Sequence, residues 1–515
     1  MTKKRDRTEN DEPEHLICPI SRVMFRDPVV VVESGHTYER ENILAHFDRN
    51  GPKEPLTGKL LEQDKLVMTN WALRNAVQDW LDEHPDVTPD GWDNRELPQP
   101  SSDDGSRPDR TLLMTWSRNS PLPNDRWSKV AEFENGRIVA LSLEAKTKAE
   151  MQAFTSIDFR DLGQLRSLKR LSLRLRHPQN LNNMFWQLTS LESLYLNGNQ
   201  LTTLPAEIGQ LTSLKELYLD SNKLTSVPAE IGQLTSLVNF DLRGNRLKSV
   251  PAEIGQLTSL QLLNLDGNQL TSVPAEMEQL TALKALGLKH NRLKSVPAEI
   301  GQLTSLTHLI LNGNQLTSVP AEIGRLASLE QLGLGSNKLT SVPAEIGRLT
   351  SLEVLDLNNN KLASVPAEIG QLTSLEVLGL RGNKLTMVPA EIGQLTKLKE
   401  LILIGNQLTS VPAELGQLTS LNELWLSGNQ LTSVPAEIGQ LTSLVKFDLR
   451  GNQLTSVPAE IGQLTSLEVL YLGGNKLTTV PVEIGQLTKL KELILISNVC
   501  LYLDHVAFEL NPLNG

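Results

Sequence analysis

The chain has 515 residues, only 4% of them aromatic, and a formal net charge of −11 at pH 7. This acidic balance argues against binding to a nucleic-acid backbone, which needs a basic face. The two cysteines, Cys18 and Cys500, are too few for a disulfide framework or a multi-thiolate zinc site, and no apolar run approaches the roughly 20 residues of a membrane span.

The first 13 residues are polar and are expected to form a disordered tail. They lack the apolar segment of a secretory signal, so we expect a reduced, cytoplasmic location. The short basic run KKRDR at residues 3–7 leaves a nuclear location open, although such runs are common in solvated tails.

Residues 14–82 are expected to fold as one small α+β module. The valine run predicts a strand over 29–32, and a helix is expected from about 39 to 47. A second helix is expected over 69–81, with Asn70 as its N-cap, because its apolar residues recur at helical spacing. These residues are Leu73, Ala76, Val77, Trp80 and Leu81.

The module begins with CPISRVMFRDPVVVVESGHTYER, which has the residue order of a RING-type module. A structural zinc site needs four ligands, mostly thiolates, and only Cys18, His36 and His46 are available as ligands. The module resembles the U-box, the zinc-free relative of the RING. The matching residues are Cys18-Pro19-Ile20-Ser21, Met24, Asp27-Pro28-Val29-Val30, Ser34-Gly35-His36-Thr37-Tyr38-Glu39-Arg40, Ile43, Pro55-Leu56-Thr57, Asn70, Leu73-Arg74 and Trp80.

In the U-box family, hydrogen bonds and ion pairs replace the cross-links made by the metal. The resemblance implies such a network here, without metal or cofactor. An ordinary surface or capping role is the alternative for each of its members. The candidates are Asp27, Ser34, His36, Thr37, Tyr38, Glu39, Arg40 and Asn70.

U-box proteins are ubiquitin ligases. They bind a conjugating enzyme charged with ubiquitin and hold its thioester for attack by a substrate lysine, without a catalytic cysteine. At Ile20 a plain core position is the alternative to enzyme contact. His46 stands where relatives often carry tryptophan, and Gly58 stands where many active relatives have a basic residue. The conjugating-enzyme contacts implied by the resemblance are Ile20, Arg22, His46, Pro55 and Lys59.

Residues 83–110 are rich in Pro, Asp, Ser and Gly and are expected to form a flexible linker. Residues 111–167 are expected to hold an N-terminal cap and an irregular first repeat, in which Ile138, Leu141 and Leu143 would form a strand.

From Asn199 to Asn498 an asparagine recurs every 23 residues within the pattern L-x-x-L-x-L-x-x-N-x-L, except that Cys500 takes the final leucine position of the last repeat. This pattern is the signature of a leucine-rich repeat. Residues 168–498 are therefore expected to form an α/β solenoid with a parallel sheet on its concave side, closed by a C-terminal cap over 499–515. We expect each asparagine to satisfy backbone groups in a turn, and a short helical turn to begin near each proline, such as Pro228.

The strand positions that face the concave side vary between repeats, whereas the convex segment is nearly constant. At the central strand position we expect exposed side chains, including Asp241 and Asp448. Large apolar groups there predict a face that binds a protein substrate, and recent duplication with drift is the alternative. The candidate binding residues are Tyr195, Tyr218, Ile310, Ile402, Trp425 and Tyr471.

Taken with the resemblance, these patterns favour a U-box ubiquitin ligase whose repeats select an unidentified protein substrate. The expected partners are that substrate and a charged conjugating enzyme, with no nucleic acid and no membrane. The alternative is a non-catalytic leucine-rich repeat scaffold with an inactive U-box. A secreted receptor is disfavoured, because neither a signal nor disulfides are apparent.

Overall fold

The computed structural model divides the chain into two compact units, Met1–Lys169 and Arg170–Gly515. The expected tail, most of the expected linker and the expected C-terminal cap lie outside the described residues. No described helix is long and apolar enough to cross a membrane. The described residues are 16–19, 21–31, 36–50, 53–57, 67–69, 71–83, 88–89, 108–118, 122, 124–127, 129–134, 137–155, 157, 159–175 and 185–498.

The first part of unit one is a three-stranded antiparallel sheet with two helices. Strand β1 (Pro28–Val31) lies between β2 (Thr37–Glu39) and β3 (Val67–Thr69). The helices are α1 (Arg40–Asn50) and α2 (Trp71–Glu83), so the expected strand and both expected helices are confirmed. The apolar side chains of these elements form one core, which includes Cys18, Val29, Tyr38, Ile43, Phe47, Val77, Trp80 and Leu81.

The second part of unit one contains the helices α3 (Pro108–Arg118), α4 (Asn124–Trp127) and α5 (Lys148–Thr155). Its strands β4 (Ala131–Glu134) and β5 (Arg137–Glu144) pair antiparallel. The expected strand is confirmed as β5, which buries Ile138, Leu141 and Leu143. Its partner β4 was not foreseen. A 3-10 helix, η2 (Phe159–Gln164), follows.

Helix α5 begins with a capping box, in which the side chains of Thr147 and Glu150 bind each other's backbone N–H groups. Glu150 also accepts a hydrogen bond from Lys146 N at 2.8 Å and pairs with Arg126 Nε at 2.5 Å. This charge–charge contact holds the pKa of Glu150 at about 2, against the opposing effect of burial. One carboxylate therefore joins α4 to the start of α5.

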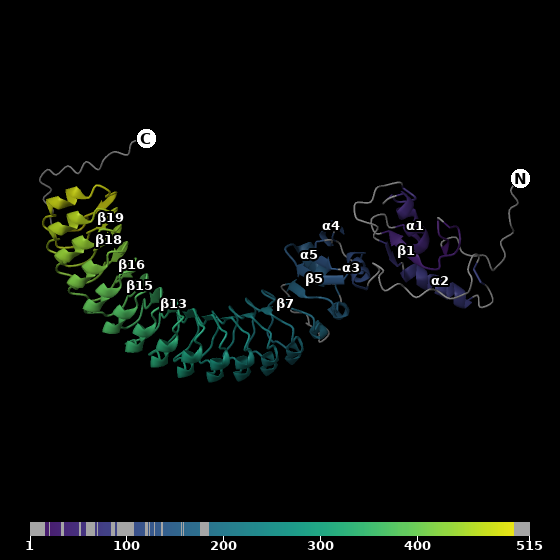
Figure 1. Cartoon of the computed structure of the whole chain (residues 1–515), viewed down its shortest axis with the longest axis horizontal. Helices are drawn as coiled ribbons and strands as arrows, with labels where there is room; N and C mark the ends of the chain where they lie inside the picture. Colours follow the sequence, from purple (N-terminus) through teal and green to yellow (C-terminus); the bar gives the residue numbers. More distant parts are fainter. Residues whose placement is uncertain are drawn as a thin grey trace. The chain divides into compact units, whose positions relative to one another are not determined.

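Unit two is a solenoid of parallel strands, each in register with the strand of the next repeat. Figure 1 shows the strands on the concave side of this array and the 3-10 turns on its convex side. The expected fold class is thereby confirmed. The strands are β6 (Arg170–Arg174), β7 (Ser193–Tyr195), β8 (Glu216–Tyr218), β9 (Asn239–Asp241), β10 (Leu262–Asn264), β11 (Ala285–Gly287), β12 (His308–Ile310), β13 (Gln331–Gly333), β14 (Val354–Asp356), β15 (Val377–Gly379), β16 (Glu400–Ile402), β17 (Glu423–Trp425), β18 (Lys446–Asp448), β19 (Val469–Tyr471) and β20 (Glu492–Ile494).

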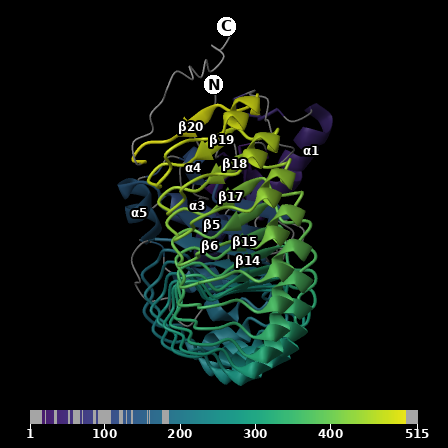
Figure 2. The same cartoon turned by 90° about the vertical axis from the view of Figure 1, so that its left-hand side faces the viewer.

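The convex side consists of short 3-10 turns, stacked in one column along the array (Figure 2). After η3 (Phe185–Gln187), they run from η4 (Ala206–Gln210) to η16 (Val482–Gln486). In η5 (Ala229–Gln233) the preceding Pro228 is extended, and its carbonyl accepts the Ile231 N–H at 3.2 Å. The expected helical turn near each proline is confirmed, in the tighter 3-10 form.

The repeated asparagine satisfies backbone groups of two neighbouring repeats. Asn314 Nδ2 donates to the carbonyls of Leu311, in its own repeat, and Leu288, in the preceding one, both at 2.9 Å. Its Oδ1 accepts the Leu293 N–H of the preceding repeat at 3.0 Å. This role was expected from the sequence and is confirmed. Water cannot reach these buried backbone groups, so the asparagine side chain supplies the hydrogen bonds that they need.

Candidate functional site

Glu54 is the polar centre of the U-box-like module, where its side chain is almost fully buried. It accepts hydrogen bonds from the Tyr38 hydroxyl and, at 2.6 Å each, from Thr57 N and Thr57 Oγ1. His36 Nδ1 lies 3.2 Å from the same carboxylate. Glu54 therefore connects the loop at 53–57 to Tyr38 in strand β2 and to His36, which precedes that strand.

The protonation states of this cluster suit its hydrogen bonds. Burial alone would raise the pKa of Glu54, but hydrogen bonds from Thr57 and Tyr38 and attraction to His36 bring it below its usual value. Burial raises the pKa of Tyr38, and Glu54 raises it further. An ionised carboxylate thus faces neutral hydroxyl donors, which is the arrangement that keeps a buried charge stable.

Glu39 at the end of β2 organises a second cluster. Its carboxylate accepts the backbone N–H groups of Arg26 at 2.9 Å and Asp27 at 2.8 Å. Burial raises its pKa in spite of these bonds. Its own N–H donates to Cys18 Sγ at 3.2 Å, and Asp27 pairs with Arg40 Nε at 2.7 Å. Polar contacts therefore connect the segment at 16–27 to β2 and α1.

The structure places most of the expected network residues in these two clusters. Asp27, His36, Tyr38, Glu39 and Arg40 make the contacts described, and Thr37 lies beside them in β2. Within the described ranges, no group of three His, Cys, Asp or Glu side chains could hold a metal ion. The remaining two candidates, Ser34 and Asn70, lie outside the described residues.

Sequence reasoning missed Glu54, the residue on which the first cluster depends. A signal was available, because Glu54 precedes Thr57 by three residues in the turn sequence E-P-L-T. An acidic side chain at the start of a turn often binds the N–H groups that follow it.

The expected contacts to a conjugating enzyme are described only in part. Ile20 and Lys59 lie outside the described residues. Arg22 is exposed and has a positive φ of 61°. His46 on α1 has its Nε2 3.0 Å from the carbonyl oxygen of Lys53, which brings α1 to the loop that contains the half-buried Pro55.

Two apolar side chains of this module are accessible, and neither was among the contacts expected from the sequence. Leu56, next to Pro55, is 57% exposed, and Leu44 on α1 is 37% exposed.

The concave face of the repeats carries the six expected apolar and aromatic residues, all half-buried. Tyr195 and Tyr218 stack in parallel planes with ring centroids 4.9 Å apart. The Tyr195 hydroxyl donates to Glu216 at 2.7 Å, and burial, together with this carboxylate, raises the pKa of Tyr195 to about 12.

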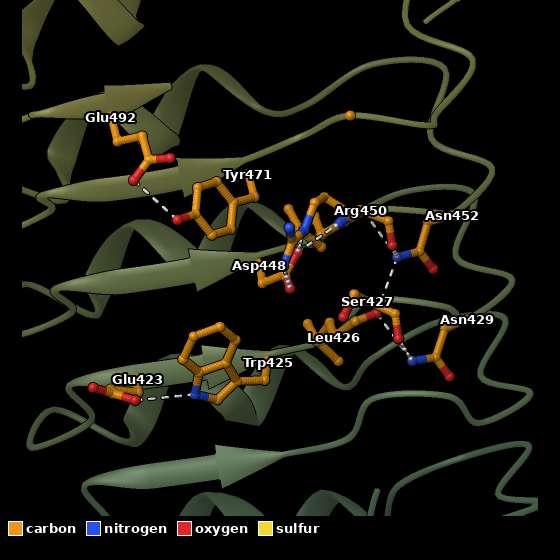
Figure 3. A network of polar contacts seen from close by, with 12 residues as sticks. Glu423, Trp425, Leu426, Ser427, Asn429, Asp448, Arg450, Asn452, Tyr471 and Glu492 are labelled. Carbon is orange, nitrogen blue, oxygen red and sulfur yellow. Dashed lines mark hydrogen bonds and ion pairs between the residues drawn. The ribbon is translucent and has the colours of Figure 1, made fainter. Parts of the chain in front are cut away.

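A second aromatic cluster lies near the C-terminal end of the array (Figure 3). Trp425 Nε1 donates to Glu423 at 3.1 Å, and the Tyr471 hydroxyl donates to Glu492 at 3.0 Å. The Arg450 guanidinium lies 4.4 Å from the Tyr471 ring centroid. Both aromatic side chains therefore have defined orientations on the face.

The expected exposure of Asp241 and Asp448 is wrong, because both are buried at 4% and 1% exposure. In each case the arginine two residues later turns back onto the carboxylate. Arg243 pairs with Asp241 at 3.0 Å and Arg450 with Asp448 at 2.7 Å, and each arginine N–H also binds the aspartate. These pairs form part of the floor of the face.

Comparison with protein families matches two parts of the chain. Residues 13–86 match the U-box domain. The leucine-rich repeat region matches residues 122–249, 275–361, 346–430 and 424–514, which together make up more than half of the chain.

Curated relatives match short stretches of the chain. A protein named "Putative E3 ubiquitin-protein ligase LIN" from Medicago truncatula is 29% identical over 134 residues, or 26% of this chain and 9% of the relative. U-box domain-containing protein 70 of Oryza sativa subsp. japonica is 40% identical over 76 residues, or 15% of this chain and 9% of the relative. The chain thus spans only a small part of these relatives.

Solved structures match over the repeats. A leucine-rich repeat protein of Leptospira interrogans is 47% identical with a TM-score of 0.62, over 66% of this chain and 86% of that one. The ectodomain of the Arabidopsis thaliana receptor kinase GASSHO1/SCHENGEN3 is 26% identical with a TM-score of 0.58, over 76% of this chain and 56% of that one. The chain therefore belongs to the leucine-rich repeat proteins and carries a U-box domain ahead of its repeats.

Proposed function

We propose that the chain is a ubiquitin-protein ligase, in which the U-box binds a charged conjugating enzyme and the repeats hold the protein substrate. The observation that carries this proposal is the hydrogen-bonded cluster around Glu54, which braces the loop bearing Pro55 and the exposed Leu56. A braced loop with an exposed apolar tip is suited to hold a partner in one orientation.

The chemistry needs no nucleophile from this chain. The substrate lysine attacks the thioester carbonyl, an amide bond forms, the carbon–sulfur bond breaks, and the conjugating enzyme leaves as a thiolate. The U-box acts by restraining the thioester in a reactive geometry. Cys18 is fully buried and accepts a hydrogen bond from Glu39 N, so it stands in the core rather than at a reacting centre.

The proposed surface for the conjugating enzyme consists of Ile20, Arg22, His46, Pro55 and Lys59, with Leu56 added. The His46–Lys53 contact supports placing α1 and the loop on one surface. The free thiol of Cys18 fits a reducing cytoplasm, where we place the chain.

The proposed substrate surface is the concave face, with Tyr195, Tyr218, Ile310, Ile402, Trp425 and Tyr471 as its anchors. Half-buried aromatic groups with fixed orientations lose little entropy on binding, which supports this assignment. We assign the segment between α2 and α3 as the linker expected at 83–110, although Glu83 ends α2 and Pro108 begins α3. Residues 499–515 are assigned as the cap at the far end.

Autoubiquitination by the full chain tests the proposal, with ubiquitin, activating enzyme and a panel of conjugating enzymes. We expect Leu56→Ala and Ile20→Ala to lower the initial rate at least about tenfold, the effect of removing an interface anchor. Met387→Ala is the matched control, since it removes a 62% exposed apolar side chain from the other unit and should leave the rate unchanged.

Two outcomes would contradict the proposal. Folded wild-type chain that forms no ubiquitin conjugates with any enzyme of the panel would favour the non-catalytic scaffold. Full activity in both variants, with folding verified by circular dichroism, would show that the conjugating enzyme binds elsewhere.

A further inference from the structure

Four concave strands, β8, β16, β17 and β20, begin with a glutamate. Three of these carboxylates accept a hydrogen bond from an aromatic side chain of the same face, as two of them show in Figure 3. These three pairs are Tyr195–Glu216, Trp425–Glu423 and Tyr471–Glu492. Within the described part of the chain the fourth, Glu400, accepts no such bond.

Glu400 lacks an aromatic donor because of a residue in the preceding repeat. In the pairs Tyr195–Glu216 and Tyr471–Glu492, the tyrosine stands 21 residues before its glutamate, on the preceding strand. The residue 21 positions before Glu400 is Gly379, which has no side chain to reach the carboxylate. The Asn358 amide borders this place, since its Nδ2 would lie 2.6 Å from a Cβ added at Gly379.

Negative charge accumulates at Glu400. Glu400 lies directly opposite Glu423 on the adjacent strand, and like charges in this arrangement destabilise a sheet. Lys446 pairs with Glu423 at 2.8 Å, whereas Glu400 has no ion pair among the described residues. Burial, and then repulsion by Glu423, raise the pKa of Glu400 against a smaller opposing attraction to Lys446. A cation placed beside Glu400 would relieve this repulsion.

Apolar surface borders the carboxylate. Ile402 lies on the same strand as Glu400, and Trp425 is its partner on the next strand. Both side chains are half-buried, and the Trp425 ring is oriented by its bond to Glu423. An aromatic face next to carboxylates is a favourable environment for a cationic group on an apolar stem.

We propose that Glu400, Ile402 and Trp425 receive an arginine side chain of the protein substrate, which takes the place that tyrosine fills at 195 and 471. This inference rests on the proposed substrate-binding role of the repeats and adds the chemistry of one contact. Arginine is favoured over lysine because its planar group can donate to a carboxylate while it stacks on an indole ring.

The probes are two pools of short fluorescent peptides with random flanks. The central residue is arginine in one pool and citrulline, its neutral isostere, in the other. Fluorescence anisotropy measures their binding to the full chain. We expect the arginine pool to bind about tenfold more tightly, and Glu400→Gln to remove this preference. In Glu492→Gln, the matched control, the preference should persist, because Tyr471 already occupies that carboxylate.

A second variant tests whether the arginine occupies the position that Gly379 leaves without a side chain. Gly379→Tyr supplies the tyrosine that precedes Glu216 and Glu492 by 21 residues. The atoms nearest its Cβ belong to the Asn358 side chain, which accepts the Arg381 N–H and must shift to make room. We expect its hydroxyl to bind Glu400 and the arginine preference to disappear. Equal binding of both pools to the wild-type chain, or a preference that survives both Glu400→Gln and Gly379→Tyr, would overturn the inference.

Failure of this inference can be told apart from failure of the proposed function. The peptide experiment needs no ligase activity, and the autoubiquitination assay needs no added substrate, so the two results are independent. Ubiquitin conjugates without an arginine preference would refute the arginine site alone. An arginine preference without conjugates would refute the ligase activity alone.

Discussion

The Tyr38 hydroxyl donates a hydrogen bond to Glu54 in the interior of the U-box. Both side chains are almost fully buried, so water cannot take the place of the hydroxyl. We expect Tyr38→Phe to lower the free energy of unfolding of the U-box by about 1–3 kcal/mol, the cost of an unsatisfied buried acceptor. Faster hydrogen exchange in residues 36–50 of the full chain would measure this loss.

Tyr195→Phe provides the control for that measurement. It removes the same hydroxyl from a bond to Glu216, but Tyr195 is only half-buried on the concave face. Water can replace the lost donor there, and the expected cost is below about 1 kcal/mol. Equal effects of the two substitutions would show that the Glu54 cluster does not stabilise the U-box.

Glu150 should make the stability of the cap region dependent on pH. Its folded pKa of about 2 lies below the ordinary value of 4.5, so its stabilising effect is complete above 4.5 and disappears as pH falls towards 2. At pH 7 we expect Glu150→Gln to lower the free energy of unfolding by about 1.5–3 kcal/mol. Urea titrations should show the difference in unfolding free energy between wild type and Glu150→Gln shrinking as the pH falls from 4.5 to 2. A difference that stays constant with pH would contradict the assignment.

Asn314 lies in the middle of the array and serves three buried backbone groups. Asn314→Ala should therefore lower the free energy of unfolding by at least about 2 kcal/mol, measured from the urea midpoint of the repeats. Asn498 makes the corresponding bonds where it is partly exposed. Asn498→Ala should cost less, and a larger loss there than at Asn314 would contradict the role of burial.

Close packing of the convex turns predicts a contrast between two glycines. A Cβ added at Gly324 would lie 2.4 Å from the backbone oxygen of Glu345, whereas no described atom lies within 4 Å of one added at Gly485. We expect Gly324→Ala to cost about 1–3 kcal/mol and Gly485→Ala to be neutral or stabilising, as thermal unfolding would show. Glu278 holds the equivalent position in η7 (Ala275–Gln279), so a local shift can accommodate a side chain there.

Much of the fold could be predicted from residue spacing. The alternating leucines determine which side of each strand is buried, and the recurring asparagine marks the turn, because both follow from contacts repeated at every period. In the U-box, the valine run predicted a strand and apolar residues at helical spacing predicted the second helix. These features depend on local pattern, which a single sequence displays directly.

The missed features depend on contacts between distant residues. Glu54 binds Tyr38 from 16 positions away, and the burial of Asp448 depends on how the Arg450 side chain turns back. The significance of Glu400 appears only when the register of the strands places Gly379 where a tyrosine could have been. Such relationships require a knowledge of which side chains are neighbours in space.

The asparagine bonds also give the array a direction. Each asparagine accepts an N–H from the repeat before it, as Asn314 does from Leu293. Removing repeats from the C-terminal end would leave main-chain groups of the new last repeat without their partner. Removing them from the N-terminal end breaks backbone bonds between repeats too, such as that from Lys215 N to the Glu192 carbonyl. Among the asparagine bonds, however, it frees only a side chain, which solvent can hydrate. Shortened versions of this solenoid should accordingly tolerate loss at the start better than loss at the finish.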